Sequence, residues 1–137
     1  MSNRSLVFIK PDGISKKIVG RVISRFEDKG FELKAMKMVQ LTNDMADKHY
    51  EEHVGKPFYP GLRDYVTSAP VIAMVLEGEK VVPIIRKMIG VTDGAEAESG
   101  TIRGDFSTSR GENIIHASDS PESAAREIAN FFPELKS

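Results

Sequence analysis

Residues 6–41 read LVFIKPDGISKKIVGRVISRFEDKGFELKAMKMVQL, and this stretch predicts a strand, a helix and a second strand in succession. The apolar run at its start ends in the tetrapeptide KPDG, as a strand does when it enters a turn. Apolar side chains then recur at i, i+3, i+4 and i+7, which is the spacing of one helix face, at Val19, Val22, Ile23 and Phe26. Gly30 stands where a helix commonly ends.

The segment from Phe31 to Leu41 predicts the second strand, with Phe31, Leu33 and Ala35 on one face. Thr42 can cap a following helix that runs towards His53. Residues 54–61 contain two prolines and two glycines and therefore predict a loop. A short helix is expected after this loop, around Leu62, Tyr65 and Val66.

The second half of the chain continues the alternation of strands and helices. Residues 70–76 are apolar at consecutive positions, which is consistent with a strand covered on both faces or with a strand whose side chains alternate poorly. A helical stripe follows at Val81, Val82, Ile85 and Ile89, and Gly90 closes it. Residues 91–111 show no sustained period, and loops of this length tend to be functional. Residues 113–117 predict a last strand, and Ser120 caps a last helix with Pro121 at its first position.

Four strands with helices between them predict a single domain over residues 1–137. The expected class is α/β (α+β), a ferredoxin-like sandwich in which helices pack on one face of a four-stranded antiparallel sheet. Residues 70–76, the longest apolar run, are too few to cross a bilayer, and no cleavable leader pattern follows the N-terminal strand. We therefore expect a cytoplasmic protein.

The composition excludes several kinds of site. The net charge of −1 provides no field that would hold nucleic acid or an acidic membrane, so any positive charge for a phosphorylated ligand must be local. The absence of cysteine excludes disulfides, thiolate metal sites and cysteine nucleophiles. No Walker A loop, G-x-x-x-x-G-K-[ST], occurs in the chain.

Glu127 is the most informative single position. It lies three residues after Ala124 and four before Phe131, so it leans into the apolar face of the last helix. A buried carboxylate needs a polar partner, and His116, at the end of the preceding strand, is the nearest candidate, with Ser118 between them. A histidine held by a carboxylate has one ring nitrogen fixed and the other free to act as a nucleophile or a base. The alternative is a buried histidine that a local carboxylate merely satisfies.

Basic residues fall near the ends of predicted elements or in the long loop, where phosphate groups could be bound: Lys10, Arg86, Arg103 and Arg110. Arginine suits phosphate because its planar fork donates paired hydrogen bonds. Taken alone, each of these side chains is better explained as a solvated surface charge, and the sequence cannot show whether they converge on His116.

Residues 49–53, HYEEH, match the zinc signature H-x-x-E-H of inverted metalloproteases. In that interpretation His49 and His53 bind zinc and Glu52 is the general base. The pattern fixes only three positions and lacks a third ligand, so the alternative is a solvated helix face.

Four segments occur in one order along the chain: KPDG at 10–13, KPFYPGL at 56–62, GTIRGDF at 100–106 and NIIHASD at 113–119. Together they closely resemble the nucleoside diphosphate kinase family, over nearly the whole chain. The resemblance implies a phosphotransferase with ping-pong kinetics and broad base specificity. It also implies a homo-oligomer, with a hexamer favoured over a tetramer, that binds nucleoside di- and triphosphates.

The resemblance also implies roles for individual residues. His116 would be the nucleophile, oriented by Glu127 with Ser118 bonded to the pair, and Tyr50 would lie close to the transferring group. The phosphates would be held by Lys10, Arg86, Thr92 and Arg103. The ribose would be bound by Asn113 together with Lys10, and the base would stack on Phe58 beside Leu62. Mg²⁺ would arrive on the nucleotide phosphates, with Asp119 contacting it through water, and no protein cage of metal ligands is expected.

The chain departs from the family pattern in two places. The loop at 92–100 lacks prolines that many relatives have, and we expect proline at positions 94 and 99 to raise the melting temperature. Arg110 stands near a position where relatives often place an apolar residue against the base, and it could stack on the base, reach a phosphate or face solvent. The alternative from another class is a catalytically silent, nucleotide-binding or protein-interaction member of the same fold.

Overall fold

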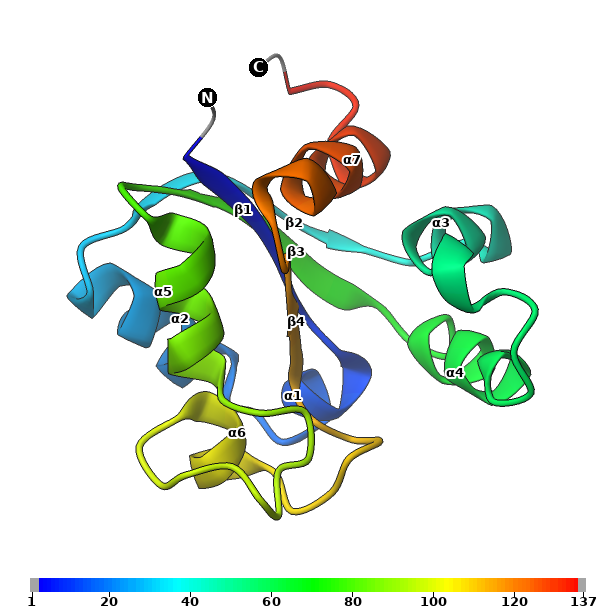
Figure 1. The fold of residues 1–137 in the computed structure, drawn as a ribbon, viewed down its shortest axis with the longest axis horizontal. Coiled ribbons are helices and arrows are strands. Elements are labelled where there is room, and N and C mark those ends of the chain that lie inside the picture. The colour runs from blue at the N-terminus through cyan, green and yellow to red at the C-terminus, as the bar shows by residue number, and fades with distance from the viewer. Residues whose placement is uncertain (1–2, 136–137) are drawn as a thin grey trace.

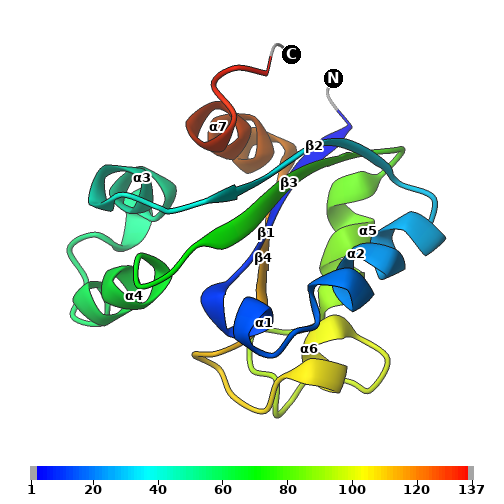
Figure 2. The same cartoon turned by 180° about the vertical axis from the view of Figure 1, so that it is seen from behind.

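The computed structural model describes residues 3–135 as a four-stranded antiparallel sheet with helices on both faces (Figure 1, Figure 2). The strands are β1 (Arg4–Ile9), β2 (Glu32–Val39), β3 (Val71–Glu77) and β4 (Ile115–Ala117). The helices are α1 (Pro11–Ser15), α2 (Val19–Asp28), α3 (Asn43–His49), the 3₁₀ turn η1 (Glu51–His53), α4 (Tyr59–Val66), α5 (Val81–Ile89), α6 (Ile102–Phe106) and α7 (Pro121–Phe131).

The strand order β2-β3-β1-β4 confirms the predicted ferredoxin-like sheet. All three neighbouring pairs are antiparallel, and β1 lies between β3 and β4. The β1–β4 register sets His116, on the edge strand β4, opposite Phe8 of the central strand β1. A residue predicted to carry chemistry is therefore attached to a buried, rigid strand pair.

The prediction that helices pack on one face only was wrong. One core contains Val22 and Phe26 of α2 and Ile85 of α5, and the other contains Ala46 of α3 and Phe131 of α7. The two groups of helices lie on opposite sides of the sheet (Figure 1). The reason is that β1 and β3 are apolar at consecutive positions, so both of their faces must be kept from water.

A β-bulge in β2 changes which face of the sheet its side chains point to. The pairing with β3 is irregular between Leu33 and Ala35. Leu33 therefore packs against the core that holds α2, whereas Ala35 packs against the opposite core. The prediction that these two residues share a face was wrong, because an inserted residue shifts the alternation of side chains.

Three segments predicted as turn or loop contain short helices. The KPDG turn becomes α1, α4 begins at Tyr59 inside the predicted loop 54–61, and α6 lies within residues 91–111. Proline at the first turn of α1 and of α4 is compatible with a helix, since those N–H groups have no partner within the helix. Thr101 caps α6 by accepting a hydrogen bond from the Gly104 N–H.

The predicted helix ends agree with the structure at several positions. Thr42 caps α3, and Ser120 caps α7 with Pro121 in its first turn. Gly30 has a φ of 99° just after α2, a backbone conformation that favours glycine. No helix within residues 3–135 is long and apolar enough to cross a membrane.

The loop between α5 and α6 does not accommodate proline at position 94, one of the two positions where proline was expected to stabilise it. The Gly94 N–H donates a hydrogen bond to the Ser109 carbonyl, at 3.0 Å, and a Cβ at Gly94 would lie 2.2 Å from the Ser107 Oγ. Proline at 94 would remove the bond and collide with Ser107. The structure therefore reverses the expectation at 94.

Candidate active site

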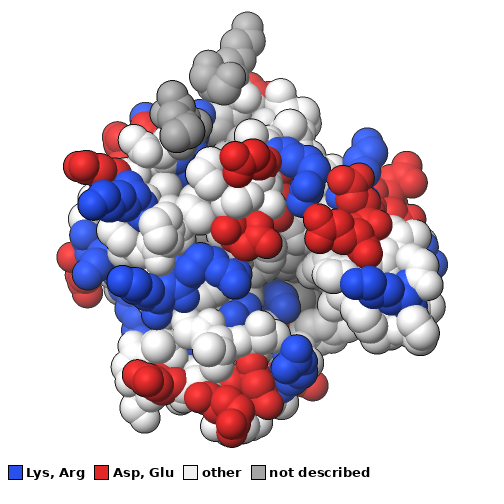
Figure 3. Space-filling view, in the orientation of Figure 1, with Lys and Arg blue, Asp and Glu red and all other residues white. Residues whose placement is uncertain are grey.

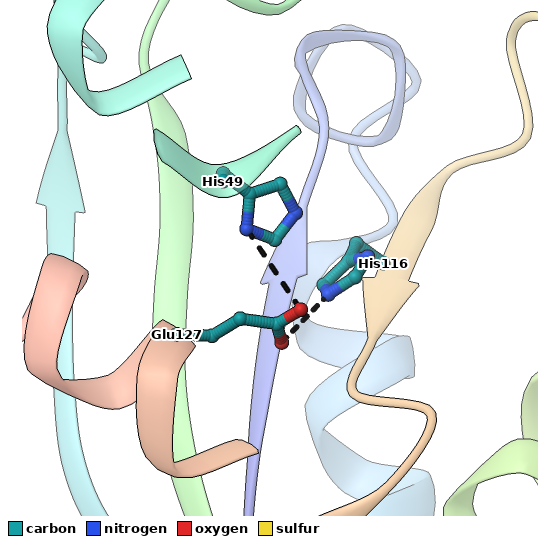
Figure 4. A group of neighbouring side chains, drawn as sticks. All are labelled: His49, His116 and Glu127. Carbon is teal, nitrogen blue, oxygen red and sulfur yellow. Dashed lines mark hydrogen bonds and ion pairs between the residues drawn. The ribbon is translucent and has the colours of Figure 1, made fainter. Parts of the chain in front are cut away.

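His116 lies on the short strand β4 with one ring nitrogen already bound. Its Nε2 is 3.0 Å from the Oε1 of Glu127, and its ring stacks on Phe8 with 5.0 Å between the ring centroids. The helix α7 buries Glu127 on its apolar face, so that only 5% of the side chain is exposed. The contact expected between these two residues is therefore present (Figure 4).

Ser118 completes the group. Its hydroxyl donates a hydrogen bond of 2.7 Å to the same Glu127 Oε1, and its oxygen accepts one from the Leu6 N–H at 3.0 Å. Because Oε1 receives a donor from Ser118, the proton between Oε1 and His116 must be on Nε2 when Glu127 is ionised. The lone pair of the neutral ring is then on Nδ1.

Two pockets meet at His116. The large pocket has a volume of about 850 Å³ and is lined by Lys10, Tyr50, His53, Phe58, Gly61, Leu62, Tyr65, Thr92, Arg110, Gly111, Glu112, Asn113 and His116. The small pocket, of about 160 Å³, is lined by His49, Tyr50, Glu52, His53, His116, Asp119, Ser123, Arg126 and Glu127. Figure 3 shows this face hollowed near its middle, with basic side chains beside and inside the hollow.

Asn113 connects three segments at the floor of the large pocket through hydrogen bonds. Its Oδ1 accepts a hydrogen bond of 2.7 Å from the Lys10 Nζ, and its Nδ2 donates to the carbonyls of Thr92 and Arg110. One buried amide thus positions a cation and two stretches of loop. Phe58 and Arg110 lie at the exposed mouth, whereas Leu62 is half-buried.

The basic residues make the site positive even though the chain is nearly neutral. Burial, and then the charges of Lys10, Arg103 and Arg86, lower the pKa of His116 to about 3. Burial and the Arg103 charge lower the pKa of Lys10 to about 8. The His116 ring is therefore neutral around pH 7, and an anion that enters the pocket relieves the repulsion among the cations.

The two arginines predicted to meet phosphate differ in their surroundings. Arg103 is buried, and it donates hydrogen bonds to the carbonyls of Gly90, Asn113 and Ile115. A guanidinium has five N–H groups, so two remain for a ligand. Arg86 is exposed and donates to the Ala117 carbonyl at 3.3 Å. Neither lines the large pocket, although both lie close enough to depress the pKa of His116.

Asp12 is a buried residue at this site that sequence reasoning missed. It accepts hydrogen bonds from the Tyr65 hydroxyl and, at 2.9 Å, from the Ile114 N–H. Ile114 has a φ of 77°, a strained conformation for a β-branched residue, and its carbonyl accepts from the Lys10 N–H. Asp12 thereby holds a bend two residues before His116, and only its place in the KPDG motif hinted at a role.

The predicted zinc signature does not form its site. The helix α3 ends at His49, so His53 does not keep the i, i+4 relation, and its Nδ1 lies 3.4 Å from the Lys56 Nζ. Within residues 3–135, the one cluster of potential metal ligands is instead His49, His116 and Glu127, whose ligand atoms lie within 4.8 Å of one another. His49 thus belongs with the His116–Glu127 pair.

Comparisons with known proteins agree with the geometry. The family model described as "Nucleoside diphosphate kinase" matches residues 3–137. The nucleoside diphosphate kinase of Methanothermobacter thermautotrophicus is 57% identical, over 96% of this chain and 87% of its own. That of Methanocaldococcus jannaschii is 56% identical, over 98% and 96%. Among solved structures, the Aquifex aeolicus enzyme has a TM-score of 0.91 at 41% identity, over 96% of each chain. A halophilic enzyme from Halobacterium salinarum in complex with CDP has a TM-score of 0.93 at 40% identity, over 96% of this chain and 88% of its own.

Proposed function

Because this chain belongs to the nucleoside diphosphate kinase family and is such a kinase, we propose that it transfers the γ-phosphate by a ping-pong mechanism through a phosphohistidine at His116. The single observation that carries the proposal is the His116–Glu127 contact of 3.0 Å, which occupies Nε2 and leaves Nδ1 with its lone pair. The ring also lines the large pocket, which has room for a nucleotide.

The chemistry follows from this arrangement. Nδ1 of His116 attacks the γ-phosphorus as the bond from phosphorus to the β–γ bridging oxygen breaks, and that electron pair leaves with the diphosphate. The proton stays on Nε2, so the phosphorylated ring is a cation, and the Glu127 carboxylate stabilises it. A second diphosphate then takes the phosphate by the reverse step, which restores the neutral ring and yields the new triphosphate.

Phosphate binding is assigned to the cations around the pocket. Lys10 reaches the pocket floor, and Arg86 and Arg103 stand close enough to His116 to act on the same phosphate groups. Thr92 lines the pocket beside them. Burial raises the pKa of Tyr50, so its phenol stays protonated and can donate to the transferring phosphate.

Nucleoside binding is assigned to the pocket mouth. Phe58 is 55% exposed and offers a free ring for stacking, with Leu62 beside it. Asn113 and Lys10 lie where they can meet ribose hydroxyls, and the exposed Arg110 can stack on the far side of the base. Stacking depends little on which base is present, so the proposed specificity is broad.

Mg²⁺ is proposed to bind with the nucleotide phosphates. Asp119 lines the small pocket beside His116, and a hydrogen bond from Ser123 holds its pKa below the usual value, so an ionised oxygen ligand is available there. Bound Mg²⁺ neutralises charge on the phosphates during transfer. Asp119 would hold the ion through water.

A homo-oligomer, with a hexamer favoured over a tetramer, is proposed from the same family and fits one feature of the fold. The strand β2 lies at the edge of the sheet and, within residues 3–135, pairs only with β3. Its Met36 and Met38 are 51% and 63% exposed. A long edge strand with exposed apolar side chains tends to pair with another chain. Light scattering checks the mass, and a monomer would contradict the proposal.

The phosphohistidine is tested by labelling. The protein is incubated with γ-labelled ATP and Mg²⁺ without an acceptor, and we expect acid-labile label on the chain that a different diphosphate removes. His116→Ala should take up no label, whereas the control Lys29→Ala, an exposed residue at the end of α2 that lines neither pocket, should label normally. Label on His116→Ala would refute the mechanism. Absence of label on the unaltered protein would favour a catalytically silent member of the family.

A further inference from the structure

Two polar atoms behind His116 face each other without a hydrogen-bond partner. The Nδ1 of His49 is buried and unpaired, and it lies 4.0 Å from the Oε2 of Glu127 (Figure 4). The other carboxylate oxygen, Oε1, is occupied by His116 and Ser118, but Oε2 has no partner among residues 3–135. A buried polar atom that lacks a partner is uncommon and calls for an explanation.

The ring of His49 is held tightly in this position. It makes edge-to-face contacts with Phe8, Tyr50, Phe131 and His116, at centroid distances of 5.2, 4.5, 5.5 and 4.4 Å. Only 2% of its side chain is exposed. The packing therefore fixes the plane of the ring, and the attraction of an Nδ1–H for the carboxylate favours the orientation in which Nδ1, and not Cδ2, faces Oε2.

The His49 ring is neutral near pH 7, so it can donate one hydrogen bond without adding a positive charge. Burial, and then the charges of His116, Lys10 and Arg126, lower its pKa well below 6.5, although Glu127 opposes the shift. A neutral imidazole has one N–H, and a carboxylate in front of Nδ1 favours the tautomer with the proton there. A neutral His49 can bind Oε2 without cancelling the negative charge that faces His116.

We propose that His49 is a positioning residue for Glu127, whose free oxygen it binds through Nδ1–H when His116 carries the phosphate. The proposal rests on the phosphohistidine mechanism. When His116 becomes a cation, Glu127 is drawn to its Nε2, and a shift of about 1 Å brings Oε2 within hydrogen-bond distance of His49. Both carboxylate oxygens are then held, which directs the negative charge at the cationic ring.

The two amide replacements of histidine separate this role from packing. In His49→Asn the amide nitrogen can occupy the place of Nδ1, whereas in His49→Gln it reaches the place of Nε2 and leaves Oε2 without its donor. We expect His49→Gln to slow phosphorylation by γ-labelled ATP in single-turnover quench-flow roughly five- to thirty-fold. This corresponds to about 1–2 kcal/mol, between the value of a neutral hydrogen bond and the lower end of the range for one to a charged group. His49→Asn should stay within about threefold of the unaltered rate. The KM for the nucleotide should not change, since His49 does not line the large pocket.

A double-mutant cycle shows whether His49 acts through Glu127. In a Glu127→Gln background, His49→Gln should slow phosphorylation by less than about twofold, because the charge that it positions is already gone. The matched control is Asn43→Gln, an exposed amide on the same helix α3 that lines neither pocket, and it should keep the unaltered rate. Thermal unfolding of each variant identifies loss of fold, and His49→Phe replaces any amide variant that does not fold.

The outcomes are distinct. Slow His49→Gln, preserved His49→Asn and a strong coupling to Glu127 support the proposal. Equal loss in both amide variants, or the same loss in the Glu127→Gln background, would show that His49 only fills space and would overturn it. An unaltered rate in His49→Gln would also overturn it. Failure of the unaltered protein to become phosphorylated would instead refute the phosphohistidine mechanism itself.

Discussion

The charge on Glu127 can be removed with little change in shape, which makes Glu127→Gln a direct test of what that charge does. Both donors, the His116 Nε2–H and the Ser118 hydroxyl, converge on Oε1 at 3.0 and 2.7 Å. The amide oxygen of glutamine can accept both bonds from the same position, and its NH₂ group then faces His49. The site geometry is therefore retained while the negative charge is lost.

The size of the effect follows from these contacts. A hydrogen bond to a charged group contributes about 1.5–3 kcal/mol and a neutral one about 1 kcal/mol, so the cationic phosphohistidine loses about 1.5 kcal/mol of stabilisation. At 1.36 kcal/mol per tenfold change in rate, the phosphorylation step should slow about ten- to thirtyfold. Single-turnover quench-flow with γ-labelled ATP measures this step separately from nucleotide release.

Stability should change in the opposite direction. Burial raises the pKa of Glu127, although His49 and Ser118 lower it in part. A carboxyl group whose folded pKa is raised stabilises the fold below its unfolded pKa of about 4.5, and this contribution is lost as the pH rises through the folded pKa. At pH 7 the charge is therefore a cost to the fold, and we expect Glu127→Gln to unfold at the same temperature or a higher one.

Glu127→Ala provides the contrast, because it leaves the His116 donor without its acceptor, at about 1–3 kcal/mol, and leaves the Ser118 hydroxyl with only the Leu6 carbonyl at 3.2 Å. It should lose both stability and activity. If Glu127→Gln phosphorylates at the unaltered rate, the negative charge plays no part in the transfer. If it loses stability together with activity, Glu127 is structural and the argument is wrong.

Three further predictions rest on single contacts. The pKa of Lys10 is about 8 in the empty site, so its charge is lost above that pH. We therefore expect kcat/KM to fall above about pH 8, and we expect Lys10→Arg to move this fall to higher pH. A profile that stays flat to pH 10 would contradict this prediction. Asp12→Ala leaves the Ile114 N–H without its acceptor. It should lower the free energy of unfolding by about 1–3 kcal/mol, measured by urea titration, and it should also lower kcat in steady-state assays. Unchanged values would mean that the bend at Ile114 forms without Asp12. Ser99→Pro should raise the melting temperature by restricting the unfolded chain. Gly94→Pro should lower it, because proline there removes the hydrogen bond to the Ser109 carbonyl and collides with Ser107. Calorimetry of the two variants tests this, and a higher melting temperature for Gly94→Pro would contradict it.

Parts of the site could be predicted because they depend on local spacing. The pairing of His116 with Glu127 follows from the phase of one amphipathic helix and from a strand that immediately precedes it. The partners of Asp12 and His49 could not be predicted, because they come from residues that are 102 and 78 positions away along the chain. Nothing in the sequence near Asp12 indicates that it meets Ile114.

The layering of the fold shows the same distinction. Consecutive apolar residues in β3 already indicated a strand covered on both faces, which requires helices on both sides of the sheet. The bulge in β2 left no comparable sign, since Leu33 and Ala35 alternate with lysine and methionine as in a regular strand. Its position depends on how β2 meets β3.

The sequence by itself determined the four strands and the longer helices, several of the caps that bound them, the membership of a kinase family and the pairing of His116 with Glu127. These features follow from the spacing of neighbouring residues, because the regular backbone of a helix or strand places residues at fixed spacings on the same face of that element. Only the tertiary structure decided the neutral state of His116 and the three hydrogen bonds that Arg103 donates to backbone carbonyls. It also decided that His49 Nδ1 lies 4.0 Å from Glu127 Oε2, beyond hydrogen-bond distance. Burial and charge at one point depend on every segment that packs around it, and here those segments come from distant parts of the chain.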